Sequence, residues 1–341
     1  MSVLQLMDFP NSGKFLNSPK NIFGMENQKN SKMADGISKR IIVVGSTNMD
    51  MVVKTSHIPV PGETVLAGSF FMNPGGKGAN QAVAVARLGG DAVFISKMGN
   101  DIFGKQSSQL LDEEGINTSY ILSDRELPSG VALITVDQSG ENSIVVASGA
   151  NANLHPPDLE NALEEIGRAN IILMQLEIPI DTVLFVARYA AAHGVRVILN
   201  PAPAGELPPE LLKHLDMITH NKTEAEMLSG IKVTNIENAK KAARAIHEKG
   251  VKNVVVTMGP LGAVIYSDGK IQVVPAQKTE AIDSTAAGDV FNGALAVALS
   301  EGKPLTDAVR FACDAAAISV TRMGAQSSIP YRNELIAAKI K

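Results

Sequence analysis

The sequence predicts an α/β fold in which a mostly parallel central sheet carries helices on both faces. From Arg40 onward, runs that are typical of strands alternate with runs of helical periodicity, and this order is typical of βαβ units. Glycines follow several of the helical runs, where helices commonly end. These glycines are Gly89, Gly90, Gly115, Gly194 and Gly250.

The predicted strands are short apolar runs without polar alternation, as expected for strands that are buried on both faces. In chain order they are Ile41–Val44, Asp91–Lys97, Ile171–Gln175, Val195–Leu199, Asp216–Thr219 and Asn253–Thr257. The predicted helices are Asn80–Leu88, Gly104–Glu114, Asp158–Gly167, Ile180–His193, Asn238–Lys249, Asp289–Ser300 and Leu305–Thr321.

Two segments, Met51–Met72 and Pro128–Ala147, interrupt this rhythm. They contain short alternating runs and the turn pairs Pro61-Gly62 and Ser139-Gly140, which predict antiparallel strands added to the main sheet. Such inserts could pair into a small β-lid over the carboxyl ends of the parallel strands. Ordinary edge hairpins are the alternative.

Composition favours a protein with a large core and without nucleic-acid or membrane partners. Of the 341 residues, 45% are hydrophobic, and the formal net charge is −4 with no basic run. No apolar run approaches the roughly 20 residues of a membrane-spanning helix. The single cysteine, Cys313, excludes an internal disulfide framework and fits a reducing compartment, so we expect a cytoplasmic protein.

Residues 1–38 differ from the rest of the chain. They are rich in Asn, Ser and Lys, show no sustained periodicity, and lack the compact apolar core of a secretory signal. We expect a disordered N-terminal extension, with Met33 as an alternative start, ahead of one domain over residues 39–341.

The segment Ala281–Ala294 carries the strongest chemical signal. An extended lead and a turn of small residues precede a predicted helix, and Asp289 lies where that helix begins. Small side chains at Ala287 and Gly288 let a ligand approach the backbone, where the free N–H groups of the first helical turn attract an anion. A carboxylate beside bound phosphate can take a proton from an alcohol. This arrangement predicts a small-molecule kinase.

Polar residues follow several predicted strands, and open parallel sheets bind ligands beyond the carboxyl ends of their strands. After the first strand, Asn48 and Asp50 would point the same way in extended backbone, as a polyol-binding pair would; a polar turn is the alternative. The glycine-rich loop that ends at Asn80 resembles a phosphate loop without matching its spacing. Within it, Lys77 and Asn80 could donate to a hydroxylated ligand, and Asn80 is also placed to cap the following helix.

Later strands are followed by further candidate groups. Glu177 places a carboxylate just past a buried strand. Asn221 and Glu224 share a helix-starting turn and form either a capping pair or a site where Asn221 touches nucleotide phosphates and Glu224 orders water around Mg²⁺. The glycine loop Thr257–Gly262 suits a ribose or adenine ring, whereas the histidines show no metal-ligand spacing.

Taken in order, these motifs closely resemble those of the ribokinase-like sugar kinase family, from about Arg40 to the C-terminus. The two glycine-containing motifs, Gly75–Asn80 and Asp283–Asp289, are specific for this family when they occur together in this order. The segments that carry the resemblance are Gly45–Asp50, Gly75–Asn80, Gln175–Glu177, Asn200–Pro203, Asn221–Glu224 and Asp283–Asp289. Within the last of them, Ala286 stands where the wider family has a glycine.

The resemblance implies a three-layer αβα sandwich with a small β-lid that also forms a homodimer contact. It implies transfer of the ATP γ-phosphoryl group to the 5-hydroxyl of D-ribose, with Asp289 as the base. It places an anion hole at Ala286, Ala287 and Gly288. The implied sugar-binding positions are Asn48, Met49, Asp50, Gly76, Lys77, Gly78, Ala79, Asn80, Glu177 and Asp289. The implied ATP-binding positions are Asn221, Thr257, Met258, Gly259, Pro260, Leu261, Gly262, Gly288, Asp289 and Cys313.

The resemblance also implies two cations. One is Mg²⁺, which Glu224 would bind through water. The other is a monovalent activator, usually K⁺, beside the anion hole, held in several cases by backbone carbonyls. The matching positions are Asp283, Thr285, Ser319, Arg322, Gly324 and Ser328.

Other functions stay open from the sequence. A kinase for 2-deoxyribose, a fructose-type sugar or a nucleoside such as adenosine is one alternative, although the Asn48 and Asp50 pair favours a small polyhydroxylated ring. A non-catalytic sugar or nucleotide sensor on the same fold is another, and the intact Asp289 argues against it. A dehydrogenase is disfavoured because the dinucleotide fingerprint is missing.

Overall fold

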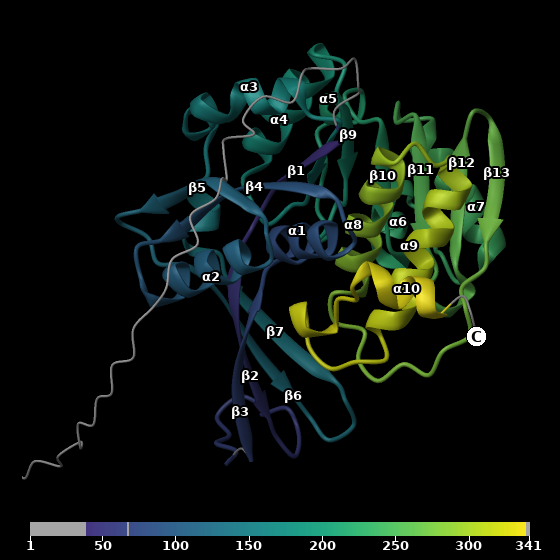
Figure 1. Ribbon diagram of the computed structural model, residues 1–341. Helices are drawn as coiled ribbons and strands as arrows, with labels where there is room; N and C mark the ends of the chain where they lie inside the picture. The colour runs from purple at the N-terminus through teal and green to yellow at the C-terminus, as the bar shows by residue number, and fades with distance from the viewer. Residues whose placement is uncertain (1–38, 67, 339–341) are drawn as a thin grey trace, which may run out of the picture. The chain divides into compact units, whose positions relative to one another are not determined.

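A nine-stranded sheet forms the centre of the fold (Figure 1). In the computed structural model, which describes residues 39–66 and 68–338, the strand order is β13-β12-β11-β10-β9-β8-β1-β4-β5. The strands from β11 to β5 are parallel, and β12 and β13 add an antiparallel hairpin at one edge. The strands are β1 (Arg40–Val44), β4 (Asp91–Gly99), β5 (Asn117–Asp124), β8 (Ile171–Met174), β9 (Arg196–Leu199), β10 (Met217–His220), β11 (Asn253–Thr257), β12 (Ala263–Ser267) and β13 (Lys270–Val274).

The parallel strands are buried on both faces, as their continuous apolar runs predict. In β1, Ile41 and Val43 point into one hydrophobic core, whereas Ile42 and Val44 point into a second core on the other face. This alternation follows from the two-residue period of a strand, and it explains why β1 contains no polar residue between Ile41 and Val44.

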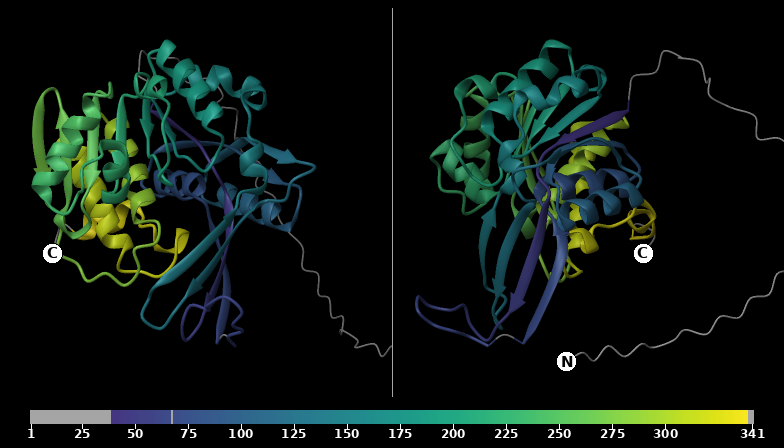
Figure 2. Two further views of the ribbon diagram at one scale, coloured as in Figure 1. Left: turned by 180° about the vertical axis from the view of Figure 1, so that it is seen from behind. Right: turned by 90° about the vertical axis from the view of Figure 1, so that its left-hand side faces the viewer.

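Helices cover both faces of this sheet, so the predicted α/β fold class, a three-layer αβα sandwich, is confirmed (Figures 1 and 2). One core joins the sheet to α1 (Lys77–Arg87), α2 (Ile102–Glu113), α8 (Ala287–Ser300), α9 (Leu305–Ser319) and α10 (Arg332–Ala338). The other core joins it to α3 (Leu163–Arg168), α4 (Ile180–Ala192), α5 (Pro209–Leu212), α6 (Lys222–Ser229) and α7 (Ile236–His247).

A separate four-stranded sheet contains strands from both predicted inserts (Figure 1). Its order is β3-β2-β6-β7, and β2 pairs in parallel with β6 at its centre. The prediction that the two inserts pair into a small sheet is confirmed. The prediction that these strands are added to the main sheet is wrong, because the alternation within an insert does not specify which strand it will pair with. Their role as a lid stays a prediction. The strands are β2 (Asn48–Lys54), β3 (Ser69–Gly75), β6 (Gly130–Val136) and β7 (Asn142–Ala147).

Several elements were missed from the sequence, namely β5, β12, β13, α5 and α10. The hairpin of β12 and β13 did carry a signal, since Asp268 and Gly269 at its turn both have positive φ, at 49° and 73°. An Asp-Gly pair between β-prone runs is a strong hairpin indicator. The predicted helix Asp158–Gly167 is in fact a 3₁₀ segment, η2 (Pro156–Ala162), that continues into α3. The remaining 3₁₀ segments are η1 (Gly149–Asn153), η3 (Gly259–Leu261) and η4 (Gln326–Ser328).

Two further expectations concern the ends of the chain and the membrane. The predicted disordered extension, residues 1–38, lies outside the described residues. Within the described part of the chain, no helix has both the length and the apolar character that crossing a membrane requires.

Candidate active site

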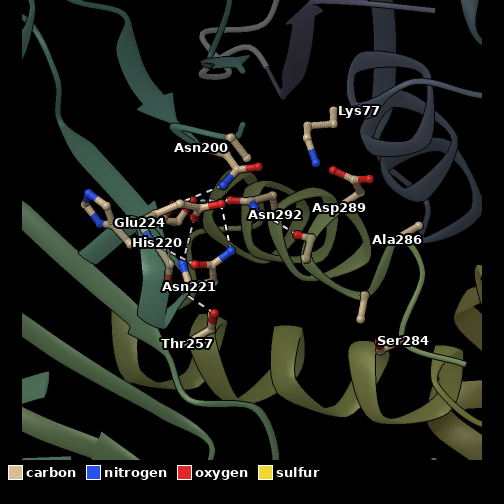
Figure 3. A pocket seen from close by; sticks show the side chains of 14 residues that line it. Lys77, Asn200, His220, Asn221, Glu224, Thr257, Ser284, Ala286, Asp289 and Asn292 are labelled. Carbon is tan, nitrogen blue, oxygen red and sulfur yellow. Dashed lines mark hydrogen bonds between the residues drawn. The ribbon is translucent and has the colours of Figure 1, made fainter. Parts of the chain in front are cut away.

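A polar cavity of about 200 Å³ lies at the carboxyl ends of the central strands (Figure 3). Residues at the ends of β9, β10 and β11 line one side, and the first residues of α1 and α8 line the other. The cavity thereby joins segments that are far apart in the sequence, as the sheet topology predicts. Its lining residues are Lys77, Asn200, Ala202, Thr219, His220, Asn221, Glu224, Thr257, Ser284, Ala286, Ala287, Gly288, Asp289 and Asn292.

Asp289 is a buried carboxylate in the first turn of α8, with a relative exposure of 6%. The side-chain amide of Asn80 donates to its Oδ2 and that of Gln81 donates to its Oδ1, each at 3.0 Å. Burial raises the pKa of Asp289, while the Lys77 ammonium and these two amides act to lower it. In Figure 3 the Lys77 ammonium points toward the Asp289 carboxylate. The donors and the Lys77 cation therefore offset the desolvation of this carboxylate only in part, and its pKa stays above the ordinary value.

Lys77 faces several carboxylates at once. Burial alone would lower the pKa of its ammonium, but the surrounding charges of Asp289, Glu177, Glu224 and Asp50 outweigh burial and raise that pKa. Lys77 is therefore a permanent positive charge in this cavity at neutral pH.

The N-terminus of α8 presents free backbone donors to the cavity. Ala286 precedes the helix with a left-handed φ of 58°, a conformation that glycine adopts more easily. Within the described part of the chain, the amides of Ala286, Gly288 and Asp289 have no hydrogen-bond partner, whereas that of Ala287 donates to Ser284 O at 3.2 Å. Such donors at the positive end of a helix dipole attract an anion.

The N-terminus of α1 differs, because a protein carboxylate already occupies it. Glu177 Oε2 accepts from the backbone N–H of Lys77 at 3.1 Å and from Ser46 Oγ at 2.5 Å. Gly76 precedes the helix with φ 89°, and a Cβ there would lie 2.7 Å from Asn48 N. The expectation that Asn80 caps this helix is wrong, because the helix begins at Lys77 and the Asn80 side chain turns to Asp289.

The strand β2 delivers two polar side chains to the same region. Asn48 Oδ1 accepts from Asn151 Nδ2 at 2.8 Å, which leaves the amide N–H groups of Asn48 available as donors. Burial, with help from Glu177 and Asp289, raises the pKa of Asp50 to about 7. Asp50 can therefore accept or donate a hydrogen bond near neutral pH.

Three predicted sugar-binding positions do not expose a side chain to a ligand. Met49 is 2% exposed and lies between Asn48 and Asp50, so strand alternation turns it to the opposite face. Gly78 and Ala79 are buried in α1, where their backbone N–H groups donate to Ser46 Oγ and Ser46 O. These residues shape the site through their backbone.

Asn221 and Glu224 form a capping box at the start of α6, so the predicted capping pair is confirmed. The Asn221 side chain accepts from Glu224 N at 2.9 Å, and Glu224 Oε2 accepts from Asn221 N at 2.7 Å. Both residues also line the cavity. Burial raises the pKa of Glu224, while the Asn221 N–H and Lys77 oppose that shift.

A second cavity of about 700 Å³ adjoins the first at the start of α8. Thr257, Ser284, Ala287 and Gly288 line both cavities. Of the predicted ATP-binding positions, Gly259, Pro260, Gly262 and Cys313 line only the larger one. Met258 and Leu261 do not line it: Met258 is buried in the core, whereas Leu261 is exposed to solvent.

Cys313 belongs to the apolar wall of this second cavity. Burial raises the pKa of its thiol to about 12, so it stays neutral. Cys313 is therefore a largely buried, neutral thiol that also lines the second cavity.

Of the positions predicted for a monovalent cation, Thr285 and Gly324 contact Asp283. Its Oδ1 accepts from Thr285 N and Oγ1, and its Oδ2 accepts from Gly324 N at 2.8 Å. The Arg322 guanidinium is paired with Glu334, so only its backbone is free to face this loop. Ser319 and Ser328 are fully buried nearby in sequence, at the end of α9 and in η4.

Sequence reasoning missed the buried amides around Asp289. Gln81 contacts Asp289 directly, and Asn292 donates to Gly288 O at 2.8 Å. Gln175 and Asn200 were noted only as members of motifs. A signal was present, because Asn80, Gln81 and Asn292 interrupt otherwise small, apolar helix sequences.

Comparison with protein families gives a match over nearly the whole described chain. Residues 38–332 match the family model described as pfkB family carbohydrate kinase.

Individual relatives agree with that match. The chain is 45% identical over 298 residues to a ribokinase from Haemophilus influenzae, which covers 87% of this chain and 97% of the relative. It is 38% identical over 291 residues to a deoxyribokinase from Salmonella typhi, with coverage of 85% and 95%. Its fold is similar to that of an Arabidopsis thaliana ribokinase complexed with ribose and ATP, with a TM-score of 0.83, 34% identity, and coverage of 88% and 98%.

The side chain of one buried residue at the edge of the cavity takes no part in the polar network of the described residues. His220 is 1% exposed at the end of β10, and within the described residues neither ring nitrogen has a hydrogen-bond partner. Figure 3 shows its ring pointing away from Asp289 and Lys77. Burial lowers the pKa of His220 to about 3, so the folded protein holds it neutral.

We expect His220→Leu to weaken the acid dependence of stability. The wild-type contribution is complete above the unfolded-state pKa of about 6.5 and is lost as the pH falls toward 3, because only the unfolded chain is then protonated. Between pH 8 and pH 5 this residue should remove about 2 kcal/mol of unfolding free energy from the wild type and none from the variant. Denaturant unfolding at both pH values measures the difference.

His214→Leu serves as the control, because His214 lies only half-buried outside the polar cavity. It should keep the acid dependence of the wild type. Equal acid dependence in His220→Leu and the wild type would show that His220 is not held neutral by the fold.

Proposed function

Because the chain belongs to the pfkB family of carbohydrate kinases, we propose that it transfers the γ-phosphoryl group of ATP to the 5-hydroxyl of D-ribose. The products are D-ribose 5-phosphate and ADP. One observation carries the proposal: a buried carboxylate, Asp289, lies beside helix N–H groups that have no partner among the described residues, where a small polar cavity meets a larger one. Phosphoryl transfer requires this combination of a proton acceptor and preorganised positive potential.

In the proposed reaction, Asp289 accepts the proton of the sugar hydroxyl while the hydroxyl oxygen attacks the γ-phosphorus. A bond forms between that oxygen and the γ-phosphorus, and the bond from the γ-phosphorus to the bridging oxygen of ADP breaks. The free N–H groups of Gly288 and Asp289 stabilise the charge on the transferred group. Lys77 adds a fixed positive charge to the same cavity.

The sugar pocket is proposed to lie between β2, the start of α1 and Asp289. Asn48 has free amide donors there, and Asp50 can accept or donate. Asn80 Oδ1 is buried without a partner among the described residues, which provides an acceptor for a sugar hydroxyl. Glu177 Oε1 likewise carries no hydrogen bond within that part of the chain. Alternating donors and acceptors suit a polyhydroxylated ring.

The nucleotide is proposed to occupy the larger cavity, with its phosphates directed to the start of α8. That cavity has an apolar wall, which includes Phe291, Cys313 and Ala316, suited to a base. Thr257, which lines both cavities, and Asn221, which lines the smaller one, would meet the phosphates.

The donor set at Glu224 suits Mg²⁺ that arrives with ATP. The described residues contain no cluster of three or more His, Cys, Asp or Glu side chains that could hold a metal unaided. Glu224 nevertheless offers a carboxylate in the cavity, and Mg²⁺ commonly binds through one or two carboxylates, waters and substrate phosphates. When bound, Mg²⁺ would neutralise phosphate charge.

The loop around Asp283 suits a monovalent cation. Backbone N–H groups of Ile282 and Asp283 both donate to Val320 O, which holds the loop against the end of α9. Asp283 and the neighbouring carbonyls supply oxygen donors, as hard cations prefer. A cation there would steady the turn that leads into α8.

The four-stranded sheet is proposed to act as a lid and as the contact of a homodimer. Asp50 faces the sugar pocket, and the opposite face presents a row formed by Met72, Met51, Leu133 and Val145 across the four strands. Met72, Leu133 and Val145 are exposed apolar side chains. A second copy of the same sheet would cover them.

A kinase acting on 2-deoxyribose is the second candidate, because one relative is a deoxyribokinase. The two candidates differ only at the sugar's 2-position, so the catalytic arrangement serves both.

We expect ADP release to require a pentose and to depend on Asp289. D-ribose should give the highest kcat/KM in a panel of D-ribose, 2-deoxyribose, fructose and adenosine. Asp289→Asn should fold and bind ATP but lose roughly a hundred-fold to ten-thousand-fold in kcat, because the proton acceptor is gone. The exposed Asp307→Asn is the control. Turnover of no sugar or nucleoside in the panel would favour a non-catalytic sensor, and near-normal turnover by Asp289→Asn would remove it as the base.

Replacing K⁺ by tetramethylammonium should lower kcat, because a bulky cation cannot enter the Asp283 loop. Asp283→Asn should reduce the difference between the two salts, whereas Asp137→Asn, at an exposed turn of the other sheet, should preserve it. Equal activity in both salts would contradict the proposed cation site.

The wild type should sediment at twice the mass of one chain. Leu133→Lys should shift it toward the monomer by placing charge in the proposed contact. Val273→Lys, at an exposed position on β13 of the main sheet, should remain a dimer. A wild type that sediments as a monomer at micromolar concentration would refute the contact.

A further inference from the structure

We propose that Gln81 is the positioning residue that holds Asp289 in its working orientation and ties it to the anion-binding turn. This inference rests on the proposed kinase function, since it assigns Gln81 a role in the same site. Gln81 is fully buried on α1 and does not line the cavity, so it acts through Asp289 rather than on a ligand.

The contact between α1 and Asp289 fixes both oxygens of the carboxylate. Gln81 Nε2 donates to Asp289 Oδ1 at 3.0 Å, and Asn80 Nδ2 donates to Oδ2 at the same distance. Two donors on one helix clamp the carboxylate plane, so rotation about its terminal bond would break a charge-assisted hydrogen bond. The orientation of the proton acceptor is therefore set from behind the cavity.

A second glutamine supports the orientation of the Gln81 amide that Asp289 requires. An ionised carboxylate only accepts, so the Gln81 amide must present its N–H groups to Asp289. Its Oε1 is then left to accept, and Gln175 Nε2 donates to it at 2.6 Å. Gln175 thus fixes the amide orientation that Asp289 needs.

Gln81 also starts a closed ring of hydrogen bonds that returns to α8. Its Nε2 donates to Asn200 Oδ1 at 3.3 Å, and Asn200 Nδ2 donates to Thr219 O at 3.1 Å. Thr219 Oγ1 donates to Asn292 Oδ1 at 2.6 Å, and Asn292 Nδ2 donates to Gly288 O at 2.8 Å. Gly288 directly precedes Asp289, so the ring joins the base and the anion-binding turn across β9 and β10.

Close packing of the two helices makes this contact possible. A Cβ at Gly293 of α8 would lie 2.5 Å from the Ala84 Cβ of α1 and 2.9 Å from Gln81 O. A larger residue would push the helices apart and lengthen the Gln81 to Asp289 bond. Gly293 thus lets α1 and α8 approach closely enough for the hydrogen bond between Gln81 and Asp289.

The charges around Asp289 explain why the donor matters. Burial favours its protonated form, and so do the nearby carboxylates of Glu177, Asp50 and Glu224. Lys77 is the cation that faces it, and Gln81 and Asn80 supply the hydrogen bonds that favour the charged form. Loss of Gln81 should therefore raise the pKa of Asp289.

Gln81→Met tests the proposal, because methionine has a similar length and no donor. We expect kcat to fall roughly ten-fold to a hundred-fold. The acid limb of the kcat profile should move up by about one pH unit, since Asp289 must lose its proton to act. Gln81→Glu should move the limb further, because two adjacent carboxyl groups resist double ionisation. Gln175→Met should move it less, in the same direction.

A purely structural role would give a different pattern. Gln81→Met would then lower thermal stability and leave the acid limb in place. Thr182→Val is the control, because Thr182 is equally buried and its hydroxyl donates to Leu154 O on the other face of the sheet. It should cost stability without moving the limb.

A direct titration separates this inference from the proposed function. The Asp289 carboxyl can be followed by ¹³C NMR of aspartate-labelled protein without any sugar, with Asp289→Asn giving the assignment. An upward shift of its pKa in Gln81→Met would support the positioning role even if D-ribose were not the substrate. An unchanged titration in Gln81→Met would overturn it, even with a wild type that phosphorylates D-ribose.

Discussion

Burial of one negative charge is the constraint on which this site depends. Asp289 is almost wholly removed from water, and an ionised carboxylate in such a place is costly unless donors and a cation accompany it. Asn80, Gln81 and Lys77 supply these from α1. The start of α1 would therefore both meet a sugar and supply the groups that favour the charged form of Asp289, so the two requirements cannot vary independently.

The N-termini of α1 and α8 differ in whether their backbone N–H groups already have a hydrogen-bond acceptor. The first amide of α1 is bound by the carboxylate of Glu177, which reaches it from the end of β8. The turn before α8 leaves the amides of Gly288 and Asp289 without partners among the described residues. Under the proposed function, a phosphate would therefore bind at the start of α8, and a neutral, hydroxylated ligand would bind at the start of α1. The two substrates of the proposed reaction would then have separate binding places.

Periodicity was enough to predict the sandwich, because strands buried on both faces need apolar runs such as Ile41–Val44. The position of Asp289 at a helix start was likewise readable, since helix termini have local signatures. The role of Gln81 could not be read from the sequence, because its partner Asp289 lies 208 positions away and no local pattern specifies that contact. The same reason explains the error at Asn80, whose capping role is favoured locally but is displaced by Asp289, and the error in assigning β2 and β6 to the main sheet.

A crystal structure with D-ribose and a non-hydrolysable ATP analogue tests the central claim most directly. We expect the sugar's 5-oxygen to lie within about 3 Å of an Asp289 carboxylate oxygen, with the γ-phosphate against the N–H groups of Gly288 and Asp289. Gln81 and Asn80 should still hold the far side of the carboxylate. A sugar bound with no hydroxyl in reach of Asp289, or phosphates bound away from the start of α8, would contradict it.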